Sequence, residues 1–216
     1  GGLITKKDLK NYRPIWRETL QGNFDEYKIV TMGPPSSGGV HIIQMLNILE
    51  NYDLVMMGHN SPTYTALLTE SMKYAYADRS KYLGDPDFFD VPVQSLISKE
   101  YAEKISNKIK LNSITPSDKV LPGSELRHES LDTTHFSVAD KDGNIVSNTY
   151  TLNSGFGSGV IVDGTGILMN NEMDDFVSAP GVPNQFGLIG GEANKIEPFK
   201  RPLSSMTPTI VLKDGK

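Results

Sequence analysis

The pair Asp132-Thr133 lies where a polar stretch of the chain meets a segment of alternating apolar and polar residues. A hydroxyl is a weak nucleophile unless a base activates it. The α-amino group of a threonine, with a pKa near ~8, can be that base. This amino group is free only if the chain is cut between the two residues. The pair therefore suggests a latent threonine nucleophile, although Thr133-Thr134 is also ordinary composition for the start of a strand.

Helical patterns dominate the chain before this pair. Thr5 is typical of a helix cap with Asp8 in the first turn, and apolar residues recur at helical spacing over 40–51. The sequence Ser61-Pro62 predicts the start of a helix that ends near residue 84. The remaining expected elements are a strand at 27–32, a helix from Ser98 to about 109, and an exposed polar connector at 111–132.

After the connector the pattern changes to a period of two. Strands are expected at 134–139 and 144–151, joined through the turn residues 140–143 as a hairpin. Residues 178–200, rich in Gly, Pro and Asn, form a long loop of the kind that often serves as a lid. Further short strands are expected at 160–162, 167–170 and 209–212. We therefore predict an α+β protein, with residues 1–132 mainly helical and residues 133–216 rich in strands.

Composition excludes several classes of protein and site. The 216 residues carry a net charge of −5 without a basic cluster, which argues against nucleic-acid binding. No apolar run approaches the ~20 residues of a membrane span. The chain has no cysteine, so disulfides and thiolate metal sites are excluded. His41, His59 and His128 lack the spacing of a metal site. Nothing in the sequence pairs His135 as a base, and the turn at 33–39 lacks the lysine of a phosphate-binding loop.

Six motifs follow one another along the chain, at residues 34–39, 74–79, 133–138, 149–153, 170–176 and 202–208. Taken together and in this order, they resemble the gamma-glutamyltransferases (gamma-glutamyltranspeptidases) of the bacterial type. The resemblance covers essentially the whole chain. It implies the N-terminal-nucleophile hydrolase fold, a four-layer αββα sandwich formed when one precursor cleaves itself into two subunits. Residues 1–132 would then end the large subunit, and 133–216 would begin the small one.

The resemblance assigns the chemistry to Thr133. Its hydroxyl would attack the carbonyl of Asp132, and hydrolysis of the resulting ester would separate the subunits. In the mature enzyme Thr133 would attack the γ-carbonyl of glutathione or another γ-glutamyl compound. The γ-glutamyl ester would then pass to water or to an acceptor amine. Thr151 would donate or accept a hydrogen bond at the nucleophile, although a β-branched residue is also normal in a strand.

The resemblance also assigns the two walls of a donor site. Asn153, Glu172 and Asp175 would bind the α-ammonium group of the glutamyl donor, with Glu172 standing where many relatives have glutamine. Ser204 and Ser205 would hold its α-carboxylate. Without the resemblance, an acidic pair capping a short helix and a serine pair in a turn would be the simpler interpretations.

The loop at 178–200 corresponds to a lid that some bacterial relatives carry over this site. Phe186 occupies the position where several lidded relatives have tyrosine, so it can pack over the site but cannot donate a hydroxyl hydrogen bond. No cofactor and no metal are implied. A periplasmic or extracellular location is implied by the resemblance alone.

The ends of the sequence suggest a piece of a longer protein, since it opens without methionine and closes on a strand running into Asp214-Gly215. The family's carboxylate-binding arginine and its oxyanion Gly-Gly pair would lie outside these residues, so this piece alone is expected to be inactive. Two alternatives stay open. One is an amidase for another substrate, such as poly-γ-glutamate or a cephalosporin side chain. The other is a non-catalytic relative that serves as a binding or structural module, which loss of Thr133 or Thr151 would mark.

Overall fold

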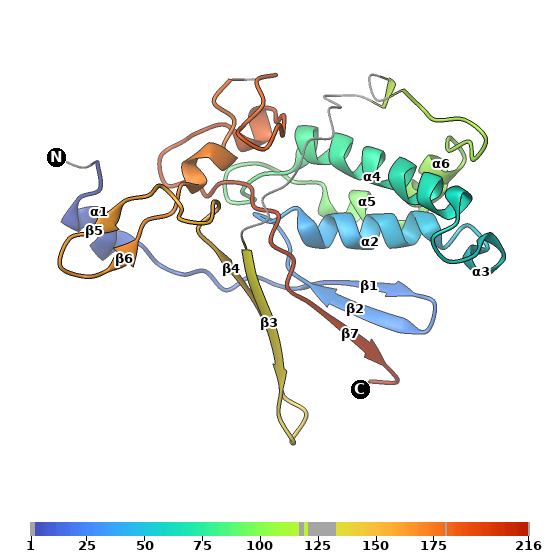
Figure 1. Cartoon of the computed structure of the whole chain (residues 1–216), viewed down its shortest axis with the longest axis horizontal. Coiled ribbons are helices and arrows are strands. Elements are labelled where there is room, and N and C mark those ends of the chain that lie inside the picture. Colours follow the sequence, from blue (N-terminus) through green and yellow to red (C-terminus); the bar gives the residue numbers. More distant parts are fainter. Residues whose placement is uncertain (1–2, 117–118, 121–132, 180, 216) are drawn as a thin grey trace.

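A computed structural model describes residues 3–116, 119–120, 133–179 and 181–215. Its centre is a layer of two long helices, α2 (Gly38–Leu49) and α4 (Pro62–Tyr82), beside a three-stranded sheet (Figure 1). The expected cleavage position at Asp132, the residue His128 and the connector between 121 and 132 lie outside the described residues.

The sheet combines strands from the two ends of the chain. Its order is β1 (Leu20–Phe24), β2 (Tyr27–Thr31) and β7 (Thr209–Lys213), and both pairings are antiparallel. The expected strands at 27–32 and 209–212 are confirmed, and β7 has β2 as its neighbour. Strand β1 was not predicted. Because β7 follows residue 133, the helical and strand-rich parts of the chain share one sheet.

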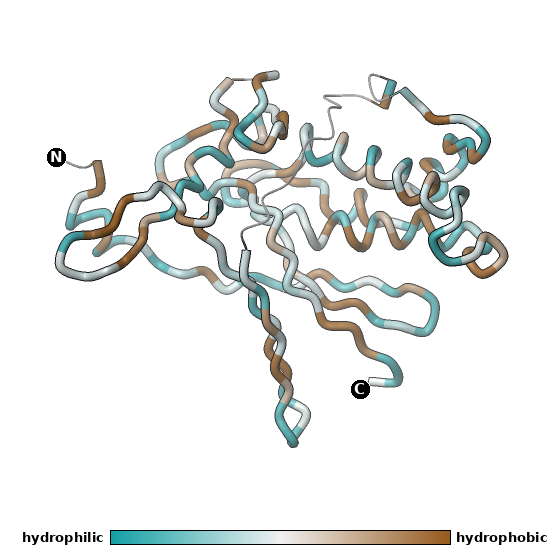
Figure 2. The backbone as a smooth tube through the Cα atoms, viewed as in Figure 1, coloured by the Kyte–Doolittle hydropathy of each residue, from teal (hydrophilic) through white to brown (hydrophobic). Residues whose placement is uncertain are grey.

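Helix α4 begins as its sequence predicts. The Ser61 hydroxyl accepts a hydrogen bond from the backbone N–H of Tyr64 at 3.1 Å, and Pro62 occupies the first turn. Helix α6 (Lys99–Ser106) follows its serine cap in the same way and is shorter than expected. These helices bury an apolar cluster, and Figure 2 shows hydrophobic residues recurring along α2. The buried members of this cluster are Ile48, Leu49, Leu67, Ala102, Ile105 and Ile109.

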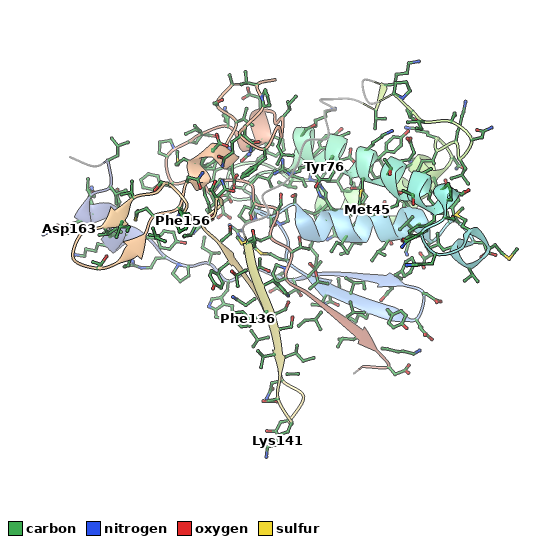
Figure 3. All side chains as sticks on the ribbon, viewed as in Figure 1. Met45, Tyr76, Phe136, Lys141, Phe156 and Asp163 are labelled. Atoms are coloured by element: carbon green, nitrogen blue, oxygen red, sulfur yellow. The ribbon has the colours of Figure 1, made fainter. Side chains whose placement is uncertain are left out.

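The predicted hairpin consists of β3 (Thr133–Ala139) and β4 (Ile145–Thr151). It projects from the body of the molecule, and every residue of β3 is exposed (Figure 1). Its turn is closed by Asp140, whose side chain accepts hydrogen bonds from the backbone N–H groups of residues 142 and 144. Figure 3 shows side chains on both faces of the hairpin, with Phe136 partway along it and Lys141 at the tip.

A tight turn at residues 33–39 supports the start of α2. A Cβ added to Gly38 would lie 1.7 Å from the Thr207 hydroxyl oxygen, and one added to Gly39 would lie 1.9 Å from the carbonyl oxygen of Met32. No larger residue fits at either position without displacing the backbone. The turn therefore packs directly against the segment at 203–207, as a rigid connection between strand and helix.

The remaining elements are short and surround this centre. Helix α1 (Lys6–Asn11) has the expected Thr5 cap with Asp8, in the form of a capping box. Strands β5 and β6 form a small hairpin where short strands were expected. The bounds of the others are α3 (Leu54–Met57), α5 (Val93–Leu96), β5 (Ile161–Val162), β6 (Ile167–Leu168), η2 (Glu172–Asp175) and η3 (Glu192–Asn194).

The mixture of helices and strands is thus confirmed, with one helical layer lying against one sheet. The complete four-layer sandwich goes beyond these elements and remains a proposal. Among the described residues, no helix is long and apolar enough to cross a membrane.

Candidate active site

The base of the β3–β4 hairpin, the loop after η2 and the segment at 203–207 enclose a cavity of about 350 Å³. That volume falls within the usual range for small-molecule sites. The cavity brings together side chains that are up to 128 positions apart in the sequence, from Arg79 to Thr207. Seven of the expected site residues line it, namely Thr133, Thr151, Asn153, Asp175, Phe186, Ser204 and Ser205.

Thr133 and Thr151 face each other at the open end of the β3–β4 hairpin, away from its turn. The register pairs them directly, and the Thr133 hydroxyl donates a hydrogen bond of 3.3 Å to the Thr151 hydroxyl. The Thr151 hydroxyl also accepts the backbone N–H of Asn153 at 2.9 Å. This second contact fixes the Thr151 side chain, which in turn orients the hydroxyl of Thr133.

Asn153 and Asp175 form the acidic wall of the cavity. Asn153 has φ of 77°, a left-handed conformation that asparagine tolerates well, and its amide donates a 3.1 Å hydrogen bond to the Asp175 carboxylate. The pKa of Asp175 is raised to about 6, mainly by burial and also by the charge of Glu172, whereas the hydrogen bond from Asn153 and the charge of Arg79 lower it. A bound ammonium group would favour the ionised carboxylate.

Ser204 and Ser205 form a second part of the cavity wall, and their backbone is held by the turn at residues 33–39. The N–H of Ser204 donates to the carbonyl oxygen of Pro35 at 2.8 Å, and its own carbonyl accepts the N–H of Ser37 at 2.8 Å. These two bonds form a short parallel bridge. The bridge fixes the peptide of Ser204, so the hydroxyls at 204 and 205 are presented on a rigid support.

The loop that was expected to be a lid reaches the cavity with Phe186. Asn184 folds the tip of the loop, because its side-chain oxygen accepts the N–H groups of Phe186 at 3.0 Å and Leu188 at 2.9 Å. Asp174 attaches this tip to η2 by accepting the N–H of Gln185 at 2.8 Å. Phe186 thus forms part of the cavity wall.

Glu172 is the expected site residue that the structure does not bring into the cavity. It lies in η2, two residues after Asn170, and borders a neighbouring hollow that also contacts Ser204 and Met206. Burial raises the pKa of Glu172. Its effect on the cavity is electrostatic, since its charge raises the pKa of Asp175.

Arg79 and His135 are among the cavity-lining residues that were not predicted. Arg79, buried near the end of α4, donates from Nε to the Ser37 hydroxyl at 3.2 Å. It belongs to the motif at 74–79, whose chemical role the sequence alone did not reveal. His135 was not expected to act as a base; alternation in β3 places it on the face of Thr133, where its Nδ1 lies 2.7 Å from the Thr149 hydroxyl.

A polar cavity lined by a pair of hydroxyls, a partly buried carboxylate and two serines is characteristic of an enzyme that binds a small polar molecule. The family model described as gamma-glutamyltranspeptidase matches residues 1–216. The chain therefore belongs to the gamma-glutamyltranspeptidase family. Within the 3–116, 119–120, 133–179 and 181–215 ranges, no cluster of three histidine or acidic residues could hold a metal ion.

Individual relatives agree with this assignment. The chain is 55% identical to the glutathione hydrolase proenzyme of Escherichia coli over 216 residues, which is all of this chain and 37% of the relative. It is 44% identical to the acylase ACY 1 proenzyme of a Pseudomonas strain, covering 36% of that protein. The chain thus spans little more than a third of the length of these relatives.

Two solved structures resemble the fold. The cephalosporin acylase of Bacillus halodurans aligns with all of this chain and 36% of its own, with a TM-score of 0.77 and 28% identity. The gamma-glutamyltranspeptidase of Helicobacter pylori aligns with 61% of this chain and 38% of its own, with a TM-score of 0.55 and 46% identity.

Proposed function

We propose that the protein containing these residues is a self-processing enzyme that transfers the γ-glutamyl group of glutathione and related compounds to water or to acceptor amines. The observation that carries this proposal is the cavity, whose lining combines the Thr133–Thr151 hydroxyl pair, Asp175, and the serines at 204 and 205. A γ-glutamyl donor presents a carbonyl carbon, an ammonium group and a carboxylate, and these three wall groups match it.

Maturation would begin with attack of the Thr133 hydroxyl oxygen on the carbonyl carbon of Asp132. The C–N bond between the two residues breaks and an ester forms, while the proton of the hydroxyl passes to the departing nitrogen. Water then hydrolyses the ester and releases Thr133 with a free α-amino group. That amino group can accept the hydroxyl proton in later turnovers, which gives the threonine its base.

Each turnover would form and break one ester. The Thr133 oxygen attacks the γ-carbonyl carbon, and the departing amine of the donor takes the proton that the α-amino group had accepted. Thr151 orients the attacking oxygen through the 3.3 Å contact. Water or an acceptor amine then attacks the γ-glutamyl ester and regenerates the hydroxyl. Phe186 would limit the access of water, and so influence the ratio of hydrolysis to transfer.

The two walls would select the head group of the donor. Asp175, held by Asn153, would pair with the ammonium group, and Glu172 would add negative charge from the neighbouring hollow. Ser204 and Ser205 would donate to the carboxylate. The arginine and the Gly-Gly pair that the family resemblance requires lie outside these residues, so the isolated 216-residue chain should release no product from a γ-glutamyl anilide. An extracytoplasmic location is part of the same proposal.

A test uses the full-length protein that carries these residues. Hydrolysis of γ-glutamyl-p-nitroanilide is compared with that of glutaryl-p-nitroanilide, which lacks only the α-ammonium group. Strong preference for the γ-glutamyl compound supports the proposal. Preference for the glutaryl compound would instead favour a side-chain acylase, the second candidate suggested by the similarity to the cephalosporin acylase. Absence of self-cleavage and of both activities would favour a non-catalytic role.

A further inference from the structure

One buried asparagine outside the cavity lining forms hydrogen bonds to the backbone of both walls. Asn194, at the end of η3, is 3% exposed and does not line the cavity. Its side-chain nitrogen donates to the backbone carbonyl oxygen of Asp175 at 2.7 Å. Its side-chain oxygen accepts the backbone N–H of Leu203, the residue before Ser204, at 3.0 Å.

The chemistry of an amide group suits this bridge. Asparagine carries one donor group and one acceptor group at a fixed separation, and both find backbone partners of the required kind here. A carboxylate of the same shape could accept from Leu203 but could not donate to the carbonyl of Asp175. Buried backbone groups that lose their partners are costly, so the bridge fixes both peptides at once.

The position of Asn194 itself is also constrained. The N–H of Val177 donates to the Asn194 backbone carbonyl at 3.0 Å, which holds the start and the end of the loop side by side. The preceding Ala193 is buried against Gly84, where an added Cβ would lie 2.1 Å from the Ala193 carbonyl oxygen. The turn at 192–194 therefore cannot move toward α4, and the bridge has a rigid base.

We propose that Asn194 is a positioning residue that sets the separation between the ammonium-binding and carboxylate-binding walls, and thereby the selectivity for donors that carry both groups. This inference rests on the proposed function. The backbone at Ser204 is also held by the turn at 33–39. The backbone carbonyl of Asp175, in contrast, accepts its side-chain hydrogen bond from Asn194. Loss of the bridge should therefore displace Asp175 relative to Ser204, and not disturb Thr133.

The test compares Asn194→Asp with Asn194→Ala in the full-length protein. A displacement of about 1 Å can reduce catalytic efficiency roughly 10–100-fold, and we expect this loss to fall on KM for γ-glutamyl-p-nitroanilide, with kcat within about threefold. Self-cleavage, which needs Thr133 but not the donor walls, should continue. Competition by L-glutamate and by glutarate, which lacks the ammonium group, should become nearly equal in the variants.

A matched control separates positioning from general loss of stability. Asn47 of α2 is 2% exposed and donates a 2.7 Å hydrogen bond to the backbone carbonyl of Ile97. Neither residue lines the cavity. Asn47→Asp should leave KM and the preference for L-glutamate unchanged. The inference is overturned if Asn194→Asp keeps the wild-type KM and preference, or if Asn47→Asp alters them equally. The inference is also overturned if the wild-type protein cleaves itself but is inhibited better by glutarate than by L-glutamate. A wild-type protein that does not cleave itself would refute the proposed function itself.

Discussion

Ionised Asp175 is partly buried, and the free-energy cost of burying its charge leads to a prediction about stability. Its pKa is raised from 3.8 to about 6, mainly by burial. At about 1.4 kcal/mol per pKa unit this is at most about 3 kcal/mol, and partial exposure of the carboxylate reduces it to roughly 1–2 kcal/mol. Asp175→Asn keeps the acceptor for the Asn153 amide and removes the charge. The substitution should therefore stabilise the protein while abolishing donor binding.

The sign of the pH dependence follows from the direction of the shift. Because the folded state has the higher pKa, Asp175 adds no cost well below the unfolded value of 3.8, where both states are protonated, and its full cost appears only above the folded value of about 6. The advantage of Asp175→Asn should thus be full at pH 8 and much smaller at pH 4. We would measure thermal unfolding of full-length protein in a Thr133→Ala background, so that every sample has the same uncleaved chain.

The expected result is a higher Tm at pH 8, since about 1 kcal/mol corresponds to roughly 2–4 °C for 150–250 residues and to a smaller shift for a longer chain. Asp163→Asn, at the exposed turn between β5 and β6 (Figure 3), is the control and should change Tm little at either pH. The reasoning is refuted if Asp175→Asn lowers Tm at pH 8, or if it raises Tm equally at both pH values.

Three other substitutions test separate contacts. Thr151→Val removes the hydroxyl that faces Thr133 and should lower kcat about 10–100-fold, with Thr151→Ser restoring most of it; equal rates would contradict the assigned contact. Asp174→Ala removes the acceptor for Gln185, so limited proteolysis within the loop at 178–200 should become faster, and an unchanged rate would refute the attachment. Gly38→Ala places a Cβ 1.7 Å from the Thr207 hydroxyl oxygen and should reduce Tm and raise the donor KM, whereas wild-type values would show that the turn can adapt.

The sequence predicted the elements whose signals are local. Ser61-Pro62 marks the start of α4, and Asp140 marks the turn of the β3–β4 hairpin, whose register then places Thr133 opposite Thr151. Strand β1 was missed because Gly22 and Asn23 are poor strand formers. Gly22 is needed there for packing, since a Cβ would lie 2.8 Å from Ile43 of α2.

Parts of the candidate site depend on contacts between distant segments. The bridge from Ser204 to Pro35 and Ser37 joins residues about 167 positions apart, and no local pattern announces it. The arginine at 79 resembles any charged residue on a helix until the fold places it in the cavity wall. Asn194 lies in the Gly-, Pro- and Asn-rich loop at 178–200, whose composition does not single out any one asparagine. The family resemblance nominated Glu172, which the structure places just outside the cavity.

The most direct test of the proposed chemistry is the intact mass of the full-length protein after incubation under folded conditions, with Thr133→Ala beside the wild type. We expect two fragments from the wild type, the smaller beginning at Thr133, and a single uncleaved chain from the variant. A wild type that stays whole, or a Thr133→Ala variant that is still cleaved at the same bond, would contradict the assignment of Thr133 as the nucleophile.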